Sequence, residues 1–410
     1  MDTPFVIVGG GLAGAKAAET LRAEGFAGPV VLVAAEPEVP YERPPLSKGY
    51  LLGTAAREEA AVLAPGWYEA HDVDLRTGAR AVGLDPAAHR VELGTGERLG
   101  YSRLLLATGA APRRLAVPGA DADGVRHLRT LADADRLVAD LAGGGRRVVV
   151  VGAGWIGLEV AAAARVHGHR VTVVEPQPTP LHGVLGPRMG EVFARLHRSH
   201  GVDLRTRTAV RGVVAPAGRV TGVELDGGEQ LPADLVVVGI GVVPETGPAV
   251  DAGLDVGDGV RTDAALRTSA PDVYAAGDVA AAHHPLYGRP VRVEHWANAL
   301  NQGPAAARSM LGQEVAYDRL PYFFSDQYEL GMEYSGLGRP EHTVVCRGDP
   351  EHGPFTAFWL DGAGRVTAGM NVDVWDVTEA VQALVRSGRP VDPAALADPD
   401  TPLESLVAAG

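Results

Sequence analysis

The fold of this chain is decided by two glycine-rich stretches, Gly9-Gly10-Gly11-Leu12-Ala13-Gly14 and Gly152-Ala153-Gly154-Trp155-Ile156-Gly157. Each follows an apolar run of strand length and precedes small and apolar residues that suit a helix. In such a turn the first glycine permits a tight bend, the second lets the backbone approach a pyrophosphate, and the third permits close helix packing. One turn of this kind could belong to another α/β protein. Its recurrence predicts two dinucleotide sites in one chain, each with the anion at a helix N-terminus.

A carboxylate follows the next strand of each unit. Glu36 comes shortly after the apolar run 30–33, and Glu175 comes roughly 20 residues after Gly152. A carboxylate at this place binds the ribose 2′-hydroxyl and repels a 2′-phosphate. No arginine follows Glu175 directly, since the next residues are Pro176-Gln177-Pro178. The sequence therefore predicts that NADH is preferred over NADPH.

Composition excludes several classes of protein. A length of 410 residues suggests two or three domains at about 150 residues each. The net charge of −14 disfavours nucleic acid as a partner. The single cysteine, Cys346, excludes an internal disulfide and any CxxC motif, so redox chemistry must rest on a bound cofactor. The histidines show no metal-ligand spacing, and we expect no metal. No apolar run is long enough for a bilayer, and the strand 5–8 leaves no room for a leader, so we expect a cytoplasmic protein.

Further motifs carry a family resemblance. The paired glycine turns, Ala107-Thr108-Gly109 and Gly277-Asp278 resemble those of the two-dinucleotide-fold pyridine nucleotide flavoprotein reductases. Four more segments narrow the resemblance to the FAD-dependent NADH:ferredoxin reductases, the putidaredoxin reductase-like family that includes reductase components of aromatic dioxygenases. They are Pro40–Lys48, Gly157-Leu158-Glu159, Val293–Trp296 and Ser325-Asp326-Gln327-Tyr328.

The resemblance implies an α/β fold of glutathione-reductase-like architecture. Two Rossmann-like domains would bind FAD and NAD, and a C-terminal α+β domain would follow. We expect the FAD-binding domain at 1–110 and 240–312, the NAD-binding domain at 111–239 and the C-terminal domain at 313–410. In the last domain, a capping-box-like spacing to Glu379 predicts a helix from about Asp376 that stops before Gly388.

The resemblance also implies the residues of the site. It assigns Lys48, Glu159 and Trp296 to catalysis, and all three to cofactor contact. The other expected cofactor-binding residues are Gly9, Gly11, Leu12, Ala13, Gly14, Glu36, Arg43, Val82, Ala107, Thr108, Gly109, Gly152, Gly154, Trp155, Ile156, Gly157, Glu175, Gly241, Gly277, Asp278, Glu294 and His295.

Each catalytic role has a plainer alternative. Lys48 would favour the reduced flavin by its positive charge, or it is a solvated surface lysine. Glu159 would pair with Lys48, link the two domains and orient the nicotinamide carboxamide, or it is a carboxylate stabilised by the start of its helix. Trp296 would cover the isoalloxazine, or it is a core aromatic residue. His295 is interpreted as structural, since the chain has no thiol pair for it to deprotonate.

The implied function is transfer of electrons from NADH through FAD to a [2Fe-2S] ferredoxin that serves a cytochrome P450 or a dioxygenase. The alternatives are a rubredoxin reductase, an NADH oxidase, or a redox-sensitive interaction protein like apoptosis-inducing factor. An acidic ferredoxin would be repelled by the net charge, so we expect a local group of arginines to receive it. The candidates are Arg289, Arg292, Arg308 and Arg339.

Overall fold

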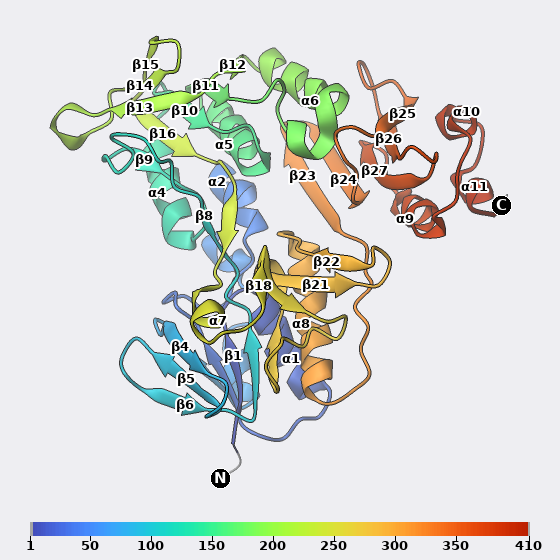
Figure 1. Ribbon diagram of the computed structural model, residues 1–410. Coiled ribbons are helices and arrows are strands. Elements are labelled where there is room, and N and C mark those ends of the chain that lie inside the picture. The colour runs from blue at the N-terminus through green and yellow to red at the C-terminus, as the bar shows by residue number, and fades with distance from the viewer. Residues whose placement is uncertain (1–2, 409–410) are drawn as a thin grey trace. The chain divides into compact units, whose positions relative to one another are not determined.

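The computed structural model describes residues 3–408, which divide into two compact units (Figure 1). The first unit comprises Met1–Arg43, Glu58–Ala111 and Val242–Pro321, and the second comprises Pro44–Arg57, Pro112–Gly241 and Tyr322–Gly410. Residues 44–57 thus group with the second glycine turn although they lie early in the chain. The expected three-domain boundaries stay a prediction.

The first unit is built on a parallel sheet of order β20-β7-β1-β2-β3. Its valine and leucine runs are buried on both faces, as is usual in parallel sheets. Because all five strands run the same way, the turns after β1, β2, β7 and β20 meet at one edge. The strands are β1 (Phe5–Val8), β2 (Val30–Val33), β3 (Val73–Arg76), β7 (Arg103–Leu106) and β20 (Val273–Ala275).

Two helices of the first unit pack closely together, α1 (Leu12–Ala23) and α8 (Trp296–Met310) (Figure 1). A Cβ on Gly303 of α8 would lie 2.4 Å from the Ala13 carbonyl oxygen, so only glycine allows this approach. The smaller elements are η2 (Arg57–Ala60), α3 (Trp67–Ala70), β4 (Ala81–Asp85), β5 (Arg90–Leu93), β6 (Arg98–Gly100), β8 (Ala110–Pro112), β17 (Val242–Pro244), α7 (Gly247–Asp251), β18 (Val256–Gly257), β19 (Gly259–Thr262), η4 (Gly277–Val279), β21 (Ala280–His284) and β22 (Arg289–Val291).

The second unit repeats the plan with a parallel sheet of order β12-β11-β10-β16-β9. Its strands are β9 (Val125–Arg126), β10 (Arg147–Val151), β11 (Arg170–Glu175), β12 (Asp203–Thr206) and β16 (Leu235–Val238). Its helices are α2 (Gly49–Leu52), α4 (Leu131–Leu141), α5 (Trp155–Val166) and α6 (His182–Ser199), with η1 (Pro44–Ser47) and η3 (Pro216–Gly218). A small antiparallel sheet holds β13 (Val210–Val214), β14 (Gly222–Leu225) and β15 (Gln230–Pro232).

The C-terminal part of the second unit is an antiparallel sheet of order β23-β24-β27-β26-β25 with short helices. The strands are β23 (Tyr322–Gln327), β24 (Leu330–Gly336), β25 (Thr343–Gly348), β26 (Phe355–Leu360) and β27 (Val366–Val372). The helices are α9 (Thr378–Ser387), α10 (Pro393–Ala397) and α11 (Leu403–Ala408). The predicted class, α/β with two Rossmann-like sheets and a C-terminal α+β region, is confirmed.

The start of α9 differs from the prediction. The helix begins at Thr378, and the residue before it, Val377, supplies no side-chain cap. Asp376, with a φ of 63°, lies one residue before the N-cap, so it is not the capping residue that the spacing to Glu379 predicts. The predicted end is right, since α9 stops before Gly388, whose φ is 59°.

None of the helices within residues 3–408 combines the length and apolarity needed to cross a bilayer.

Candidate dinucleotide and redox site

The first glycine turn joins β1 to α1 and is shaped by close backbone contacts. Gly9 has a φ of +128°, and a Cβ there would lie 2.0 Å from the Ala107 carbonyl oxygen at the end of β7. A Cβ on Gly14 would lie 2.0 Å from the Gly9 oxygen, so this glycine lets α1 pack on the turn. Gly11 differs, because a Cβ there would meet nothing within 4 Å.

The second turn joins β10 to α5 and repeats this geometry. A Cβ on Gly152 would lie 2.4 Å from the Gly239 carbonyl oxygen, and one on Gly157 would lie 2.2 Å from the Gly152 oxygen. At Gly154 the nearest atom, again the Gly239 oxygen, is 3.8 Å away. In both turns the outer glycines are required by the protein itself, whereas the middle one faces open space. A dinucleotide pyrophosphate at the helix N-terminus fits this open space, and a side chain would fill it.

The carboxylate after β2 belongs to a small polar cluster in the first unit. Arg43 donates to Glu36 over 2.8 Å and to the Tyr41 hydroxyl over 3.1 Å, and Tyr41 donates to the other oxygen of Glu36. Burial lowers the pKa of Arg43, but the nearby Tyr41 hydroxyl and the carboxylates of Glu36 and Asp278 raise it above its usual value overall. Arg43 therefore acts electrostatically on both Glu36 and Asp278, two of the residues expected to contact FAD.

The turn after β20 is fastened by α8. The buried Gln302 side chain accepts a hydrogen bond of 2.9 Å from the Gly277 amide, next to Asp278. His295 is the N-cap residue of α8 and Trp296 is its first residue. Burial lowers the pKa of His295 to about 4, with Asp278 acting in the opposite sense, so its imidazole is neutral at neutral pH. This neutrality agrees with the structural interpretation of His295.

The other expected residues of the first unit lie at the same edge of the sheet, with one exception. Leu12 and Ala13 begin α1 and are buried, and Ala107, Thr108 and Gly109 follow β7. Thr108 donates to the Glu245 carbonyl over 2.7 Å. Glu294, just before α8, forms an ion pair with Arg292. Val82 is the exception, because it lies on β4 with 47% of its surface exposed.

The carboxylate of Glu175, at the end of β11, is hydrogen-bonded to the second glycine turn. Glu175 accepts hydrogen bonds of 2.7 Å from the Ala153 amide and 2.9 Å from the Gln177 amide. The backbone amide of Arg207 donates to the Gln177 carbonyl over 3.1 Å. Arg207 is exposed, and the structure pairs it with no carboxylate among the described residues. The fold therefore brings an arginine to the Glu175 loop that is not adjacent in sequence.

A buried polar cluster of the second unit surrounds Glu159 on α5, whose side chain is 3% exposed. Lys48 donates to Glu159 Oε1 over 2.8 Å, and Ser325 donates to the same oxygen over 2.7 Å. Ser47 donates to Oε2. The Lys48 ammonium also lies 5.5 Å from the centre of the Phe324 ring. The expected pairing of Glu159 with Lys48 is present, and both residues belong to the second unit.

The hydrophobic surroundings of this cluster come from the same elements. Trp155 contacts Phe323 and Phe193 edge to face, with centroid distances of 4.9 and 5.5 Å. Ile156, next to Trp155, is 43% exposed. Gly241 follows β16 and has a φ of +91°. Its carbonyl oxygen accepts a hydrogen bond of 2.9 Å from the Arg113 amide.

Sequence reasoning missed several residues of these clusters. Ser47, Tyr41 and Ser325 lie inside quoted motifs, but no spacing rule gives their hydrogen-bond partners. Gln327 donates to Ser325 over 3.1 Å, and the buried His197 lies 2.9 Å from Gln327. No sequence signal connects His197 on α6 with the strand β23.

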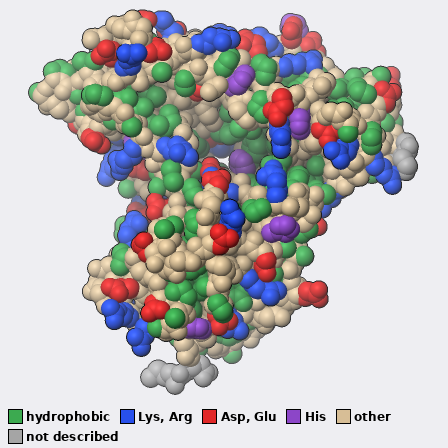
Figure 2. Space-filling view, viewed as in Figure 1, with side chains coloured by type: hydrophobic (Ala, Val, Ile, Leu, Met, Phe, Trp, Pro, Cys, Tyr) green, Lys and Arg blue, Asp and Glu red, His purple; other side chains and the backbone are tan. Residues whose placement is uncertain are grey.

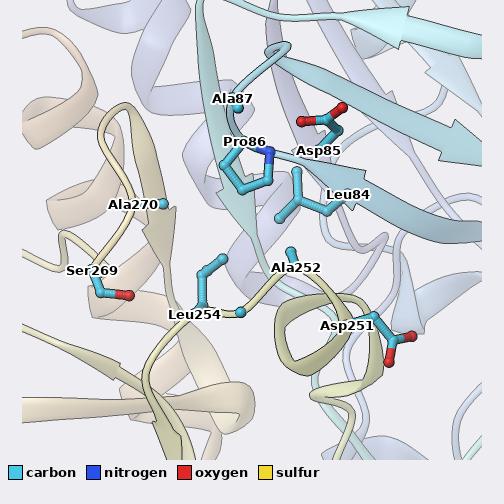
Figure 3. A pocket seen from close by; sticks show the side chains of 10 residues that line it. Leu84, Asp85, Pro86, Ala87, Asp251, Ala252, Leu254, Ser269 and Ala270 are labelled. Atoms are coloured by element: carbon cyan, nitrogen blue, oxygen red, sulfur yellow. The ribbon is translucent and has the colours of Figure 1, made fainter.

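A separate hollow of about 560 Å³ lies in the first unit, between the β4–β5 turn and the end of α7 (Figure 3). Figure 3 shows the side chains of Leu84 and Pro86 facing Ala252 and Leu254. Its residues belong to neither glycine turn. Within residues 3–408 there is no group of three or more histidine, cysteine, aspartate or glutamate residues suited to a metal ion.

Comparisons with known proteins agree with this geometry. Residues 3–303 match the family "pyridine nucleotide-disulphide oxidoreductase", and residues 322–407 match the family "reductase C-terminal". The ferredoxin–NAD⁺ reductase component of the anthranilate 1,2-dioxygenase system of Burkholderia cepacia is 44% identical over 405 residues, covering 98% of this chain and 99% of that protein.

Two solved structures are also similar. One is the covalent putidaredoxin reductase–putidaredoxin complex, with a TM-score of 0.94 and 37% identity over 100% of this chain and 99% of that chain. The other is the ferredoxin reductase for the CYP199A2 system of Rhodopseudomonas palustris, with a TM-score of 0.94 and 33% identity over the whole of both chains. The predicted resemblance and the predicted use of FAD and NAD(H) are confirmed. The chain belongs to the pyridine nucleotide-disulphide oxidoreductase family and is an oxidoreductase with a reductase C-terminal domain.

Proposed function

We propose that this protein transfers electrons from NADH through FAD to a [2Fe-2S] ferredoxin that serves a cytochrome P450 or a dioxygenase. The observation that carries the proposal is the duplicated glycine turn, open at Gly11 and at Gly154, in a chain with one cysteine. Two dinucleotides can bind, and no dithiol within the chain can relay their electrons. An external one-electron acceptor fits this arrangement, and a ferredoxin is the acceptor in the names of the relatives.

The bound cofactors supply the redox chemistry, in which NADH gives a hydride to FAD. The chain binds and orients them. In the first unit, Gly11 and the start of α1 would receive the FAD pyrophosphate, while Glu36 would accept from the ribose. Asp278 would accept from the ribityl chain, and Trp296 would cover the flavin ring.

In the second unit, Gly154 and the start of α5 would receive the NAD pyrophosphate, and Glu175 would accept from the adenosine ribose. Glu159, on the helix that starts at this turn, would orient the nicotinamide carboxamide. Lys48 is held by Glu159, and its charge would favour the reduced flavin. The buried ion pair supports this role, because a lysine held at 2.8 Å by a 3% exposed carboxylate is not a freely solvated side chain.

The acceptor site requires a change to the arginine hypothesis. Arg292 is paired with Asp258 and Glu294, and Arg308 is paired with Glu24. These two arginines are neutralised locally, so they add little to a basic docking surface. The face in Figure 2 has Lys and Arg side chains interspersed with Asp and Glu.

The candidates that remain are Arg289 and Arg339. Arg339 lies 3.8 Å from Glu341, with both side chains about two thirds exposed at 65% and 66%. Such a surface ion pair contributes little stabilising free energy and leaves the arginine able to bind an acidic partner.

Acceptor assays test the function. NADH-reduced protein is mixed anaerobically with a [2Fe-2S] ferredoxin and, separately, with a rubredoxin, and its oxidation by oxygen is measured in a third experiment. The proposal expects ferredoxin to be reduced fastest. Faster reduction of rubredoxin, or of oxygen, would assign the protein to the alternatives. Slow reaction with all three and a long-lived flavin–nicotinamide complex would indicate a redox-sensitive interaction protein instead.

Substitutions test the residue roles. Lys48→Ala and Glu159→Gln should each slow flavin reduction by NADH by at least about tenfold, the scale of one lost charge-assisted interaction. Bound FAD should be retained, and Lys48→Ala should lower the flavin potential. An unchanged rate and potential in Lys48→Ala would make Lys48 an ordinary structural residue.

We also propose a cytoplasmic location, because the NADH pool that the protein would draw on is cytoplasmic. Fractionation of cells producing the full chain tests this directly.

A further inference from the structure

A chain of hydrogen bonds leads from the Lys48–Glu159 pair to a buried histidine. Ser325 donates to Glu159 Oε1 over 2.7 Å, and Gln327 Nε2 donates to the Ser325 hydroxyl over 3.1 Å. Gln327 Oε1 then lies 2.9 Å from His197 Nε2. Ser325, Gln327 and His197 are all at most 1% exposed. The chain therefore runs through the interior of the second unit, from α5 across β23 to α6.

The direction of every hydrogen bond in the chain is determined. A carboxylate only accepts, so Ser325 must give its one hydroxyl hydrogen to Glu159. Its oxygen must then accept from the amide NH₂ of Gln327, which turns the amide oxygen towards His197. His197 must carry its hydrogen on Nε2. All donors point towards Glu159.

The surroundings of His197 favour this same tautomer. Nδ1 is buried, and no residue in the described part of the chain forms a hydrogen bond with it. A hydrogen on Nδ1 would be an unsatisfied buried donor, and such donors are rare. Burial lowers the pKa of His197 to about 4, with Gln327 opposing and His200 reinforcing the shift, so the ring is neutral and carries one N–H. In the other tautomer Gln327 would turn over, Ser325 would donate to Gln327, and Glu159 would lose a donor.

We propose that Gln327 and His197 are positioning residues, which act through Ser325 to hold the Glu159 carboxylate, and with it Lys48, in the orientation used for flavin reduction by NADH. The inference rests on the proposed function of the Lys48–Glu159 pair. The alternation of side chains along β23 supports this positioning role, because residues 325 and 327 share one face of the strand while Asp326 is exposed. His197 contributes by selecting one of the two amide orientations of Gln327.

The decisive experiment is a double-substitution cycle in the FAD-loaded protein. Gln327→Leu should slow flavin reduction by NADH about fivefold, the scale of one net hydrogen bond. In a Ser325→Ala background the same substitution should cost nothing further, because its effect passes through Ser325. The control is Gln382→Leu, which removes another glutamine-to-serine hydrogen bond, 3.2 Å to Ser335, without touching the chain. It should leave the rate unchanged.

Two readouts do not depend on turnover. The dissociation constant for NAD⁺, measured by calorimetry on the oxidised protein, should rise in Gln327→Leu and stay the same in Gln382→Leu. The ¹⁵N resonances of His197 should report a hydrogen on Nε2 and should shift in Ser325→Ala, although Ser325 does not touch the ring. A second pair of variants tests the positioning role if Gln327→Leu does not fold. His197→Gln keeps a donor for Gln327 and should stay close to the native rate, whereas His197→Leu should be slow.

Equal slowing by Gln327→Leu with and without Ser325 would overturn the inference. So would a hydrogen on Nδ1 of His197, or equal rates in His197→Gln and His197→Leu. If Lys48→Ala and Glu159→Gln slow reduction while the Gln327 and His197 variants do not, only the positioning role fails. If Lys48→Ala and Glu159→Gln leave reduction unchanged, the proposed function of the pair fails, and the positioning role fails with it.

Discussion

Gly154→Ala should separate dinucleotide binding from folding in the second unit. The backbone of Gly154 is already extended, with a φ of −78° and a ψ of 179°, so alanine is allowed there. The nearest protein atom to a new Cβ is 3.8 Å away, an ordinary van der Waals contact. The methyl group therefore leaves the protein unstrained and occupies only the space expected for the NAD pyrophosphate.

The magnitude follows from the interaction that the methyl group displaces. A hydrogen bond between a backbone N–H and an anion contributes about 1.5–3 kcal/mol, so NAD⁺ should bind roughly 10- to 100-fold more weakly. The free energy of unfolding should change by no more than about 0.5 kcal/mol. Gly157→Ala is the contrast, because its Cβ would lie 2.2 Å from the Gly152 oxygen and the turn must shift. That variant should lose about 1–3 kcal/mol of stability, as in overpacked cores.

The assay is calorimetric titration of the FAD-loaded protein with NAD⁺, together with denaturant unfolding of the same samples. Gly183→Ala on α6 is the matched control for binding, since its Cβ would meet nothing within 4 Å, and it should leave the affinity for NAD⁺ unchanged and not lower the stability. Native NAD⁺ affinity in Gly154→Ala would refute the pyrophosphate assignment. A loss of stability in Gly154→Ala as large as that in Gly157→Ala would refute the steric reasoning.

Three further predictions concern charge. Glu175→Gln should raise kcat/KM for NADPH relative to NADH by about tenfold, because the repelling carboxylate is gone and Arg207 can meet the 2′-phosphate. Adding Arg207→Ala should remove that gain. Equal use of NADPH and NADH by the unaltered protein would contradict the assignment of Glu175. Hydrogen bonds from Arg147 lower the pKa of Asp234 to about 2, so this pair stabilises the fold above pH ~4 and the contribution is lost as the pH falls through about 2. Arg147→Ala should therefore flatten the acid limb of the denaturant stability profile, and an unchanged limb would show that the pair contributes nothing. Reduction of an acidic ferredoxin should slow with rising salt and with Arg289→Glu, since salt screens exposed charges beyond about 8 Å. A small neutral dye should be reduced at the same rate under both changes. A ferredoxin rate that does not depend on salt would place docking elsewhere.

The glycine turns were predictable from sequence because their constraints are local. A strand, a tight bend and a helix fix the backbone within a few residues, so the motif alone assigns roles to Gly152 and Gly157. The parallel sheets then follow, since each turn must lie at the carboxyl end of a buried strand. The capping residue of α9 was predicted wrongly, because a polar spacing to Glu379 does not reveal that the chain becomes helical only after Val377.

Residue contacts between distant segments were not predictable in the same way. The absence of an arginine after Glu175 is a true statement about sequence, yet β12 and its following turn bring Arg207 to the same loop. Pairing of Glu159 with Lys48 came only from the family resemblance. Ser325 contacts Glu159 across 166 residues of chain, and no local rule of spacing reaches that far.

The two units share the glycine turn but differ in the residues that hold the carboxylate after the second strand. Both units hold the carboxylate after the second strand with two hydrogen bonds, but the donors differ. Glu36 is held by the side chains of Tyr41 and Arg43, whose segment continues directly into Lys48. Glu175 is held by backbone amides of its own turn and loop, and no side chain within residues 3–408 forms a hydrogen bond with it. The outer glycines of both turns face a backbone oxygen in the same way, at 2.0 Å for Gly9 and 2.4 Å for Gly152, so the two sites differ chiefly in these flanking groups.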